Sequence, residues 1–282
     1  MPMPTPSQTT RQAIVDLLSD PLFEMIPLSN ILEQARHLPA GARISVTASP
    51  NKTLDESLDL AAELSEQGFR VTPHLSARMI NSHRHLGLLL ERIERIGLTR
   101  AFVVGGDGEP NGPFFDGLAL LEGMEKIGHS LDVGIPCYPE GHPHISDAAL
   151  SEALSAKSPH ARWMTSQMCF DGDAVRRWAR DTRADGVALP LVLGLPGAAD
   201  RLKLLRISAR IGVGGSLTFL RKNTGLVSQF VKPGGYDPAE LLLDLGDDLA
   251  DPEMNTTGCH VYTFNQCDTT EEWRRSFLDS LA

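Results

Sequence analysis

Short apolar or β-branched runs recur along the chain, and most of them precede a segment with the periodicity of an amphipathic helix. Thr-Leu-Asp-Glu at 53–56 has the form of a capping box that opens a helix, and Gly68 stands where that helix is expected to end. Gly97, Gly128 and Gly212 mark the ends of later helical segments in the same way. The apolar runs predict strands at 21–26, 43–48, 70–75, 100–105, 132–137, 162–167, 187–193 and 260–264.

Eight strands that alternate with helices predict a parallel sheet of the α/β class, and eight such units in about 250 residues predict a closed (β/α)8 TIM barrel. We expect one barrel domain over residues 20–282. The interval 195–258 is more than twice the usual spacing, so extra helices are expected before the last strand, including one over 238–245. An open doubly wound sheet is the alternative, but Gly-Gly-Asp-Gly at 105–108 lacks the GxGxxG spacing of that fold.

Composition and charge exclude several classes of protein. With 282 residues, 41% hydrophobic and 22% charged, the chain has the composition of an ordinary globular protein. Its 36 acidic and 26 basic side chains give a net charge of −10, which argues against nucleic-acid binding and against an anionic membrane as partner. The longest apolar run, 187–199, has 13 residues and is interrupted by proline and glycine, so no membrane span is expected.

The N-terminal residues and the cysteines point to a cytoplasmic protein. Residues 1–12 are polar and rich in Pro and Thr, which predicts a disordered extension, and we assign 1–19 to an N-terminal tail. The four cysteines form no CxxC pair, so reduced thiols are expected and neither a zinc site nor a disulfide framework is indicated.

Barrel enzymes place their chemistry at the C-terminal ends of the strands. Polar groups stand at seven of the eight predicted ends: Glu24, Thr47, His74, Asp107, Tyr138, Gln167 and Tyr262, with Glu140, His142, Asp171 and Asn265 close by. Apolar neighbours surround Glu24, and desolvation there would make its carboxyl a usable acid, whereas the alternative is a residue at the solvent rim. Asp107 lies between glycines that suit either a tight turn or the approach of a flat ligand.

Other polar groups have simpler interpretations. The pair His142 and His144, with Glu140 nearby, could ligate a metal, but no further ligand has recognisable spacing, so no metal is expected. The Arg176, Arg177 and Arg180 cluster predicts an exposed helix face, as does the pair His83 and His85. An aldolase-like barrel would need a Schiff-base lysine at a strand end, and no predicted end carries one.

The strand-end residues resemble those of the 5,10-methylenetetrahydrofolate reductases, which are flavin-dependent (β/α)8 barrel enzymes of one-carbon metabolism and methionine biosynthesis. Tyr-Pro-Glu-Gly-His-Pro at 138–143 resembles the family's YPExHP, and Gly-Cys-His-Val-Tyr-Thr-Phe-Asn at 258–265 resembles GxHFYTLN. The further motifs FEFFPP, SVT, PHLT, LRGD and TQFFFD are matched in the right order at 23–27, 45–47, 72–75, 106–107 and 165–171. The resemblance covers residues 20–275.

The resemblance implies a reaction and a set of site residues. NAD(P)H would reduce bound FAD and leave, and 5,10-methylenetetrahydrofolate would then take a hydride from flavin N5. Glu24 matches the general acid that opens the folate imidazolidine ring, and Asp107 matches a carboxylate beside the flavin. The matched FAD contacts are Thr47, His74, Gly106, Asp107, Phe115, Tyr138, His142 and Lys157. The matched folate contacts are Gln167, Tyr262 and Gln266. Homo-oligomers are common in the family.

Several positions depart from the family pattern. Gly105 replaces the arginine of LRGD, Phe115 replaces a tyrosine, and Leu150 replaces an aspartate of the FAD-binding segment. Ala198 stands where the family has a phenylalanine over the flavin, and Gln266 follows the last motif where the family has arginine. Two alternatives therefore stay open: a reductase fed by an electron-donor protein, and a non-reducing tetrahydrofolate-binding barrel of the methyltransferase or accessory-subunit type.

Overall fold

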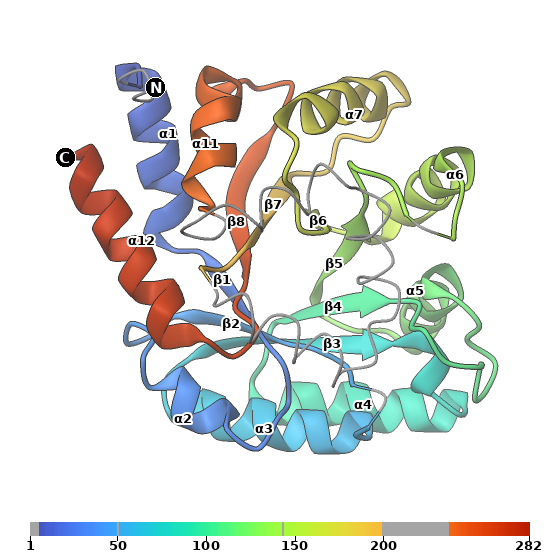
Figure 1. The fold of residues 1–282 in the computed structure, drawn as a ribbon. Coiled ribbons are helices and arrows are strands. Elements are labelled where there is room, and N and C mark those ends of the chain that lie inside the picture. Colours follow the sequence, from blue (N-terminus) through green and yellow to red (C-terminus); the bar gives the residue numbers. More distant parts are fainter. Residues whose placement is uncertain (1–5, 50, 143, 199–236) are drawn as a thin grey trace.

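The protein folds into a closed barrel of eight parallel strands in the order β1 to β8, which confirms the predicted (β/α)8 class (Figure 1). The computed structural model describes residues 6–49, 51–142, 144–198 and 237–282. The barrel closes because β1 pairs in parallel with both β2 and β8. The strands are β1 (Leu22–Met25), β2 (Arg43–Val46), β3 (Arg70–Ser76), β4 (Arg100–Val104), β5 (Asp132–Cys137), β6 (Trp163–Ser166), β7 (Leu191–Pro196) and β8 (Thr256–Tyr262).

Helices surround the strands on all sides of the barrel (Figure 1). They are α1 (Gln8–Ser19), α2 (Ile31–Ala35), α3 (Leu54–Glu66), α4 (His83–Ile96), α5 (Gly117–Ile127), α6 (Asp147–Lys157), α7 (Gly172–Ala184), α11 (Ala239–Leu245) and α12 (Cys267–Leu281), with 3-10 turns η1 (Ala77–Met79), η2 (Ser158–His160) and η3 (Gly246–Ala250). The capping box at Thr53 and Glu56 is present, and Gly97 and Gly128 end α4 and α5 as predicted. Helix α11 confirms the helix expected over 238–245, whereas Gly212 lies outside the described residues.

The start of the chain corrects one prediction. Residues 8–12 belong to α1, so the disordered extension predicted for 1–12 is wrong there, and residues 1–5 lie outside the described part. The Ser7 hydroxyl accepts from the Thr10 backbone N–H at 3.0 Å and caps the helix. Ile14, Leu17 and Leu18 are buried, and α1 packs against η3 and against α12, which lies beside it in Figure 1. Apolar residues at helical spacing therefore make α1 part of the fold.

The last two strands begin away from their predicted positions. The predicted start of β7 at 187 is wrong, because the Arg183 guanidinium binds the carbonyls of Val187 and Leu189 at 2.6 and 2.9 Å and holds them outside the sheet. Strand β8 begins at Thr256, ahead of its predicted start at 260, because the polar and glycine residues there pair with β7 across a register shift.

Among the described residues, the buried apolar side chains form two clusters. The larger one lies between the strands and the surrounding helices. The smaller one consists of Phe102, Trp163 and Val192, which lie on β4, β6 and β7. Gly134 on β5 makes room for the indole, since a Cβ there would lie 2.2 Å from a Trp163 ring atom. No helix in the described ranges is long and apolar enough to cross a membrane.

Candidate functional site

Glu24 lies at the centre of a group of polar side chains contributed by β1, β2, β3 and β8. Its carboxylate Oε2 is 3.0 Å from Nε2 of His260 and 3.9 Å from Nε2 of His74. The same nitrogen of His74 is 2.7 Å from the Ser45 hydroxyl. Parallel strands in matched register bring these residues together, since Glu24 pairs with Ser45 across β1 and β2 and with Tyr262 across β1 and β8. The predicted candidates Glu24, His74 and Tyr262 thus belong to one cluster.

Burial determines the charge of this cluster. The side chain of Glu24 keeps 16% of its surface exposed, whereas His74 is only 7% exposed. Burial lowers the pKa of His74 from 6.5 to about 4, because desolvation outweighs the attraction of the Glu24 carboxylate. His74 is therefore neutral near pH 7 and serves as a hydrogen-bonding group.

The ends of β1 and β8 fix the backbone of Glu24. The Thr263 hydroxyl donates to the Glu24 carbonyl at 2.6 Å. The Asn265 side chain accepts from the Ile26 N–H and donates to the Ile26 carbonyl, both at 2.8 Å. Phe264 and Asn265 have φ values of 51° and 53°, which is the turn geometry that lets this side chain reach β1. Asn265, a predicted strand-end residue, thus fixes the backbone that follows Glu24.

Tyr262 connects the Glu24 cluster to β6. Its hydroxyl donates to the Ser166 carbonyl at 2.9 Å, and burial raises its pKa well above the usual value. Close packing at this point requires Gly194 on β7, because a Cβ there would lie 2.3 Å from that same Ser166 carbonyl oxygen. The phenol is therefore a neutral group held in one position.

The loop after β5 holds a second cluster of predicted residues. The rings of Tyr138 and His142 meet edge to face with centroids 5.3 Å apart, and the Asp107 charge acts on both of them. Burial raises the pKa of Tyr138 to about 12 and lowers that of His142. Glu140 accepts from the backbone N–H groups of Phe170 and Asp171 at 2.5 and 2.8 Å, so it joins the loops after β5 and β6.

Comparison with known proteins identifies the family. The family model described as methylenetetrahydrofolate reductase matches residues 25–209. The chain belongs to the methylenetetrahydrofolate reductase family. A Caenorhabditis elegans relative, described as a probable methylenetetrahydrofolate reductase (NADPH), is 25% identical over an alignment of 183 residues, and the match covers 59% of this chain and 28% of the relative. The chain thus matches little more than a quarter of that protein.

A solved structure shares the fold of this family member. It is an uncharacterized protein from Clostridium thermocellum that binds two copies of 5-methyl-5,6,7,8-tetrahydrofolic acid. The two chains superpose with a TM-score of 0.63 over 96% of this chain and 99% of the other, at 10% sequence identity. At this identity the likeness shows the barrel fold alone.

The glycine-rich turn of this methylenetetrahydrofolate reductase homologue follows β4. Gly106 has a φ of 93°, and a Cβ there would lie 2.2 Å from the Ser76 hydroxyl oxygen, so glycine is required by the end of β3. Arg78 donates to the carbonyls of Gly108 and Phe115 at 3.1 and 2.9 Å and holds the turn from the neighbouring loop. Asp107 on this turn is exposed to solvent.

The remaining predicted residues lie in different environments. Gln167 is exposed, Thr47 is half-buried, and the Phe115 ring is 60% exposed. Lys157 is half-buried, and burial lowers its pKa although Cys137 and Asp116 act in the opposite direction. Gln266 is buried. The exposed groups are available to a ligand at the surface, whereas Gln266 contributes to the packed end of the barrel.

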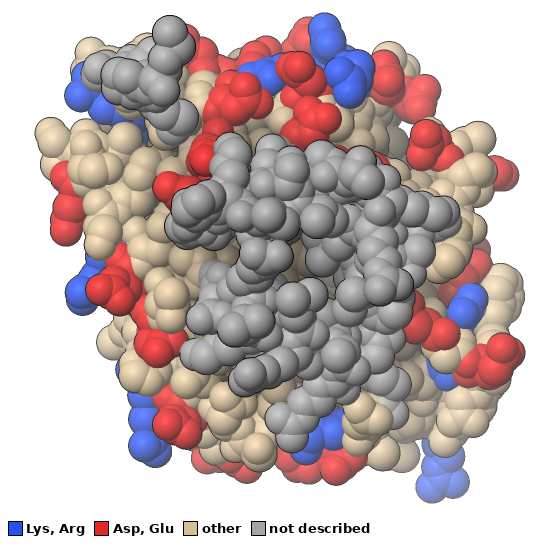
Figure 2. Space-filling model, in the orientation of Figure 1, with Lys and Arg blue, Asp and Glu red and all other residues tan. Residues whose placement is uncertain are grey.

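Acidic groups prevail on the visible face of the protein, and Lys and Arg occur in fewer places (Figure 2). The prediction of an exposed basic helix face is wrong for Arg176, which is half-buried and lies 2.9, 3.5 and 2.5 Å from carboxylate oxygens of Asp173, Asp244 and Asp248. Arg177 and Arg180 are exposed as predicted.

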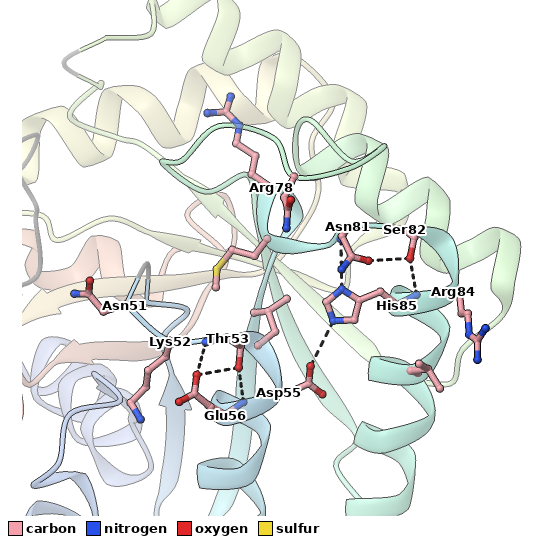
Figure 3. A pocket seen from close by; sticks show the side chains of 14 residues that line it. Asn51, Lys52, Thr53, Asp55, Glu56, Arg78, Asn81, Ser82, Arg84 and His85 are labelled. Carbon is pink, nitrogen blue, oxygen red and sulfur yellow. Dashed lines mark hydrogen bonds and ion pairs between the residues drawn. The ribbon is translucent and has the colours of Figure 1, made fainter.

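A groove of about 840 Å³ lies beside the barrel mouth, between the loops that precede α3 and α4 (Figure 3). Its acidic residues have partners nearby: Glu56 accepts from the Thr53 N–H at 2.7 Å, and Asp55 lies 3.5 Å from His85. His85 is thus half-buried, against the fully solvated position predicted for it. The groove is lined by other residues than the Glu24 cluster.

Sequence reasoning missed His260, Ser45 and Thr263. A signal for His260 was present, because it stands two positions before Tyr262 in a predicted strand and so shares its face. Ser45 likewise lies two positions before Thr47.

Proposed function

We propose that this protein is a flavin-dependent oxidoreductase that interconverts 5,10-methylenetetrahydrofolate and 5-methyltetrahydrofolate. One observation carries the proposal: Glu24 is a largely buried carboxyl in the barrel of a methylenetetrahydrofolate reductase family member, within 3.0 Å of a histidine. A carboxyl that is shielded from water and still has an accessible edge suits a general acid. The Glu24 cluster is therefore the proposed catalytic centre.

Glu24 acts on the folate in this proposal. It gives a proton to a nitrogen of the imidazolidine ring, the adjacent C–N bond opens, and the cationic iminium form of the substrate results. The carboxylate that remains stabilises the cation by charge. His74 stays neutral beside it, so it does not compete for that interaction.

The residues at the barrel mouth fit a flavin. The exposed Phe115 ring offers an aromatic face, Lys157 offers a cation for phosphate, and Tyr138 with His142 offers an aromatic pair next to Asp107. Thr47 and Gly106 complete the proposed set together with His74. When bound, FAD supplies hydride transfer at N5. NAD(P)H is the proposed electron donor, and the name of the nematode relative supports NADPH.

Gln167 and Tyr262 are the proposed folate contacts, whereas Gln266, the third residue matched to the family's folate set, is buried at the packed end of the barrel. The neutral phenol of Tyr262 stands next to Glu24 in the strand pairing, which puts a flat apolar surface beside the acid. The neighbour from Clostridium thermocellum binds 5-methyltetrahydrofolate on the same fold, which supports a folate as the ligand.

A second candidate function is a tetrahydrofolate-binding barrel without reductase activity. The replacement of arginines by Gly105 and Gln266 favours it, because each removes a cation that would hold an anionic ligand. A reductase that takes electrons from a partner protein is the intermediate case, and Ala198 in place of an aromatic residue favours that one.

One experiment separates these candidates. Protein reconstituted with FAD is photoreduced without oxygen and mixed with 5,10-methylenetetrahydrofolate. Return of the oxidised flavin spectrum supports the reductase, whatever its natural electron donor. Tetrahydrofolate and formaldehyde, added separately, are the controls. Tetrahydrofolate has no methylene group to reduce, so it should leave the flavin reduced. A protein that binds folate in equilibrium dialysis but retains no flavin is the non-reducing barrel.

A further inference from the structure

His260 is a buried histidine of the Glu24 cluster that the proposed function does not use. It lies on β8 and is 1% exposed. Its ring packs against Tyr262, with centroids 4.8 Å apart, and faces Phe102 at 6.4 Å. The ring is thus held in place from the strand that carries it and from β4.

The two ring nitrogens of His260 have different surroundings. Nε2 lies 3.0 Å from the Glu24 carboxylate oxygen Oε2. Nδ1 is buried and has no hydrogen-bond partner among the described residues. A neutral imidazole carries one proton, on one of these two nitrogens. A proton on Nδ1 would leave a buried donor unpaired and would set the lone pair of Nε2 against the carboxylate, both of which cost free energy.

The position of the proton follows from that difference. On Nε2 the proton makes a hydrogen bond to a carboxylate, which is roughly twice as strong as a bond between neutral groups. A doubly protonated ring would again leave a buried Nδ1–H unpaired. The geometry therefore favours the neutral ring with its proton on Nε2.

The other groups around Glu24 do not compete for Oε2. His74, from β3, directs its Nε2 to Ser45 at 2.7 Å and lies 3.9 Å from Glu24, beyond hydrogen-bond range. The Tyr262 hydroxyl, from β8, donates to Ser166. Thr263 bonds the backbone carbonyl of Glu24 and not its side chain.

We propose that His260 is the positioning residue of the acid: its Nε2–H donates to Oε2 of Glu24, which leaves Oε1 to carry the proton that is given to the folate. The proposal rests on the proposed function for that last step. As Glu24 loses its proton, Oε2 gains negative charge and the bond from His260 strengthens. His260 thus assists the folate half-reaction and has no part in the reduction of the flavin.

Two variants of His260 test this role in rapid-mixing experiments. His260→Phe keeps the ring packing and removes the donor, and we expect it to slow reoxidation of the reduced flavin by 5,10-methylenetetrahydrofolate by about 10- to 100-fold. His260→Gln retains an N–H donor and should restore most of that rate. Reduction of the flavin by NAD(P)H should stay within about two-fold in both. Cys259→Ala, at a buried free cysteine next to His260 on β8, is the control for loosening of the strand.

The pH profile separates positioning from packing. Loss of a donor to the carboxylate favours the protonated acid, so the alkaline limb of the folate half-reaction should move to higher pH in His260→Phe. In Cys259→Ala and His260→Gln the alkaline limb should stay at the pH at which it lies in wild type. An unmoved limb in His260→Phe, or equal slowing of both half-reactions, would overturn the proposal.

A measurement without turnover distinguishes failure of this proposal from failure of the proposed function. Long-range proton–nitrogen NMR spectra of the nine ¹⁵N-labelled histidines report the tautomer of each ring. The signal that disappears in His260→Phe belongs to His260. A proton on Nε2 alone at neutral pH supports the proposal even if the protein reduces no folate. A proton on Nδ1, or a doubly protonated ring, refutes it.

Discussion

At the scale of single residues, burial decides which groups of the site carry charge. His74 and Glu24 lie 3.9 Å apart, yet the histidine stays neutral because its ring is almost wholly withdrawn from water. Burial shifts the pKa of Glu140 in the other direction: it raises the pKa of this carboxyl, although two backbone N–H groups donate to it. The site therefore presents neutral donors and rings around one accessible carboxyl.

The low pKa of His74 predicts a pH-dependent loss of stability. Between pH 6.5 and pH 4 the unfolded chain binds a proton at this residue and the folded protein does not, so acid favours unfolding. From pH 7 to pH 5 we expect this group to lower the free energy of unfolding by about 2 kcal/mol. In urea denaturation, the free energy of unfolding of His74→Phe should therefore fall less than that of wild type between pH 7 and pH 5, by about 2 kcal/mol. The exposed His37, replaced by Gln, is the control, and equal falls in His74→Phe and wild type would contradict the assignment.

Sequence patterns predicted only part of the site. Glu24, His74 and Tyr262 were predicted because each stands at the end of a strand, and the barrel brings them together. Ser45 and His260 were missed because their contacts depend on which residues face each other across three strands. Glu24 and His260 are 236 positions apart, and only closure of the barrel makes them neighbours.

At the scale of elements, glycines set how closely the strands approach. At Gly194 on β7 the backbone N–H donates to the Ser166 hydroxyl at 2.7 Å, and the Ser166 carbonyl accepts from Tyr262. A side chain at this position would collide with that carbonyl. The position of Tyr262 beside Glu24 therefore depends on Gly194, which lies on a different strand.

Gly194→Ala should destabilise the protein by about 1–3 kcal/mol, because backbone atoms of β6 would have to move. Gly87 is the matched control: it lies within α4 with open space around it, so Gly87→Ala should stabilise by about 0.5–1 kcal/mol. Urea denaturation measures both. A neutral Gly194→Ala would show that β6 and β7 have more room than the structure gives them.

Helix α1 provides a second prediction at this scale. Leu18 is fully buried at its end, where the Leu18 carbonyl also accepts from Arg274 at 2.8 Å. Leu18→Ala should cost about 2–5 kcal/mol of unfolding free energy. Leu88→Ala, the same change at a residue that is 54% exposed on α4, should alter it by less than about 0.5 kcal/mol. An effect of Leu18→Ala as small as that of Leu88→Ala would instead support the prediction that residues 1–19 form a tail.

Element boundaries followed from the sequence where the apolar runs were unambiguous. The limits predicted for β5 are those observed, and β1 to β4 lie within a residue or two of theirs. The start of β7 was misplaced because apolar residues there bind Arg183 through their carbonyls, and that of β8 because its first residues are polar. The local sequence pattern shows neither the contact with Arg183 nor the pairing of the first β8 residues with β7.

At the scale of the whole molecule, an acidic protein is proposed to bind two anionic ligands. The chain carries a net charge of −10, whereas His74, the buried histidine beside Glu24, is neutral near pH 7. Family membership and the closed barrel are consistent with a site at the mouth, where loops from several strands converge. The central claim is that Glu24 serves the folate and not the flavin.

The most direct test compares the two half-reactions in wild type, Glu24→Gln and the exposed control Glu33→Gln, with FAD-loaded protein in the absence of oxygen. Glu24→Gln should leave flavin reduction by NAD(P)H nearly unchanged and slow reoxidation by 5,10-methylenetetrahydrofolate by about 10²- to 10⁴-fold, the usual contribution of a positioned acid. Glu33→Gln should match wild type in both. Equal losses in the two half-reactions of Glu24→Gln, or no loss in either, would contradict the account.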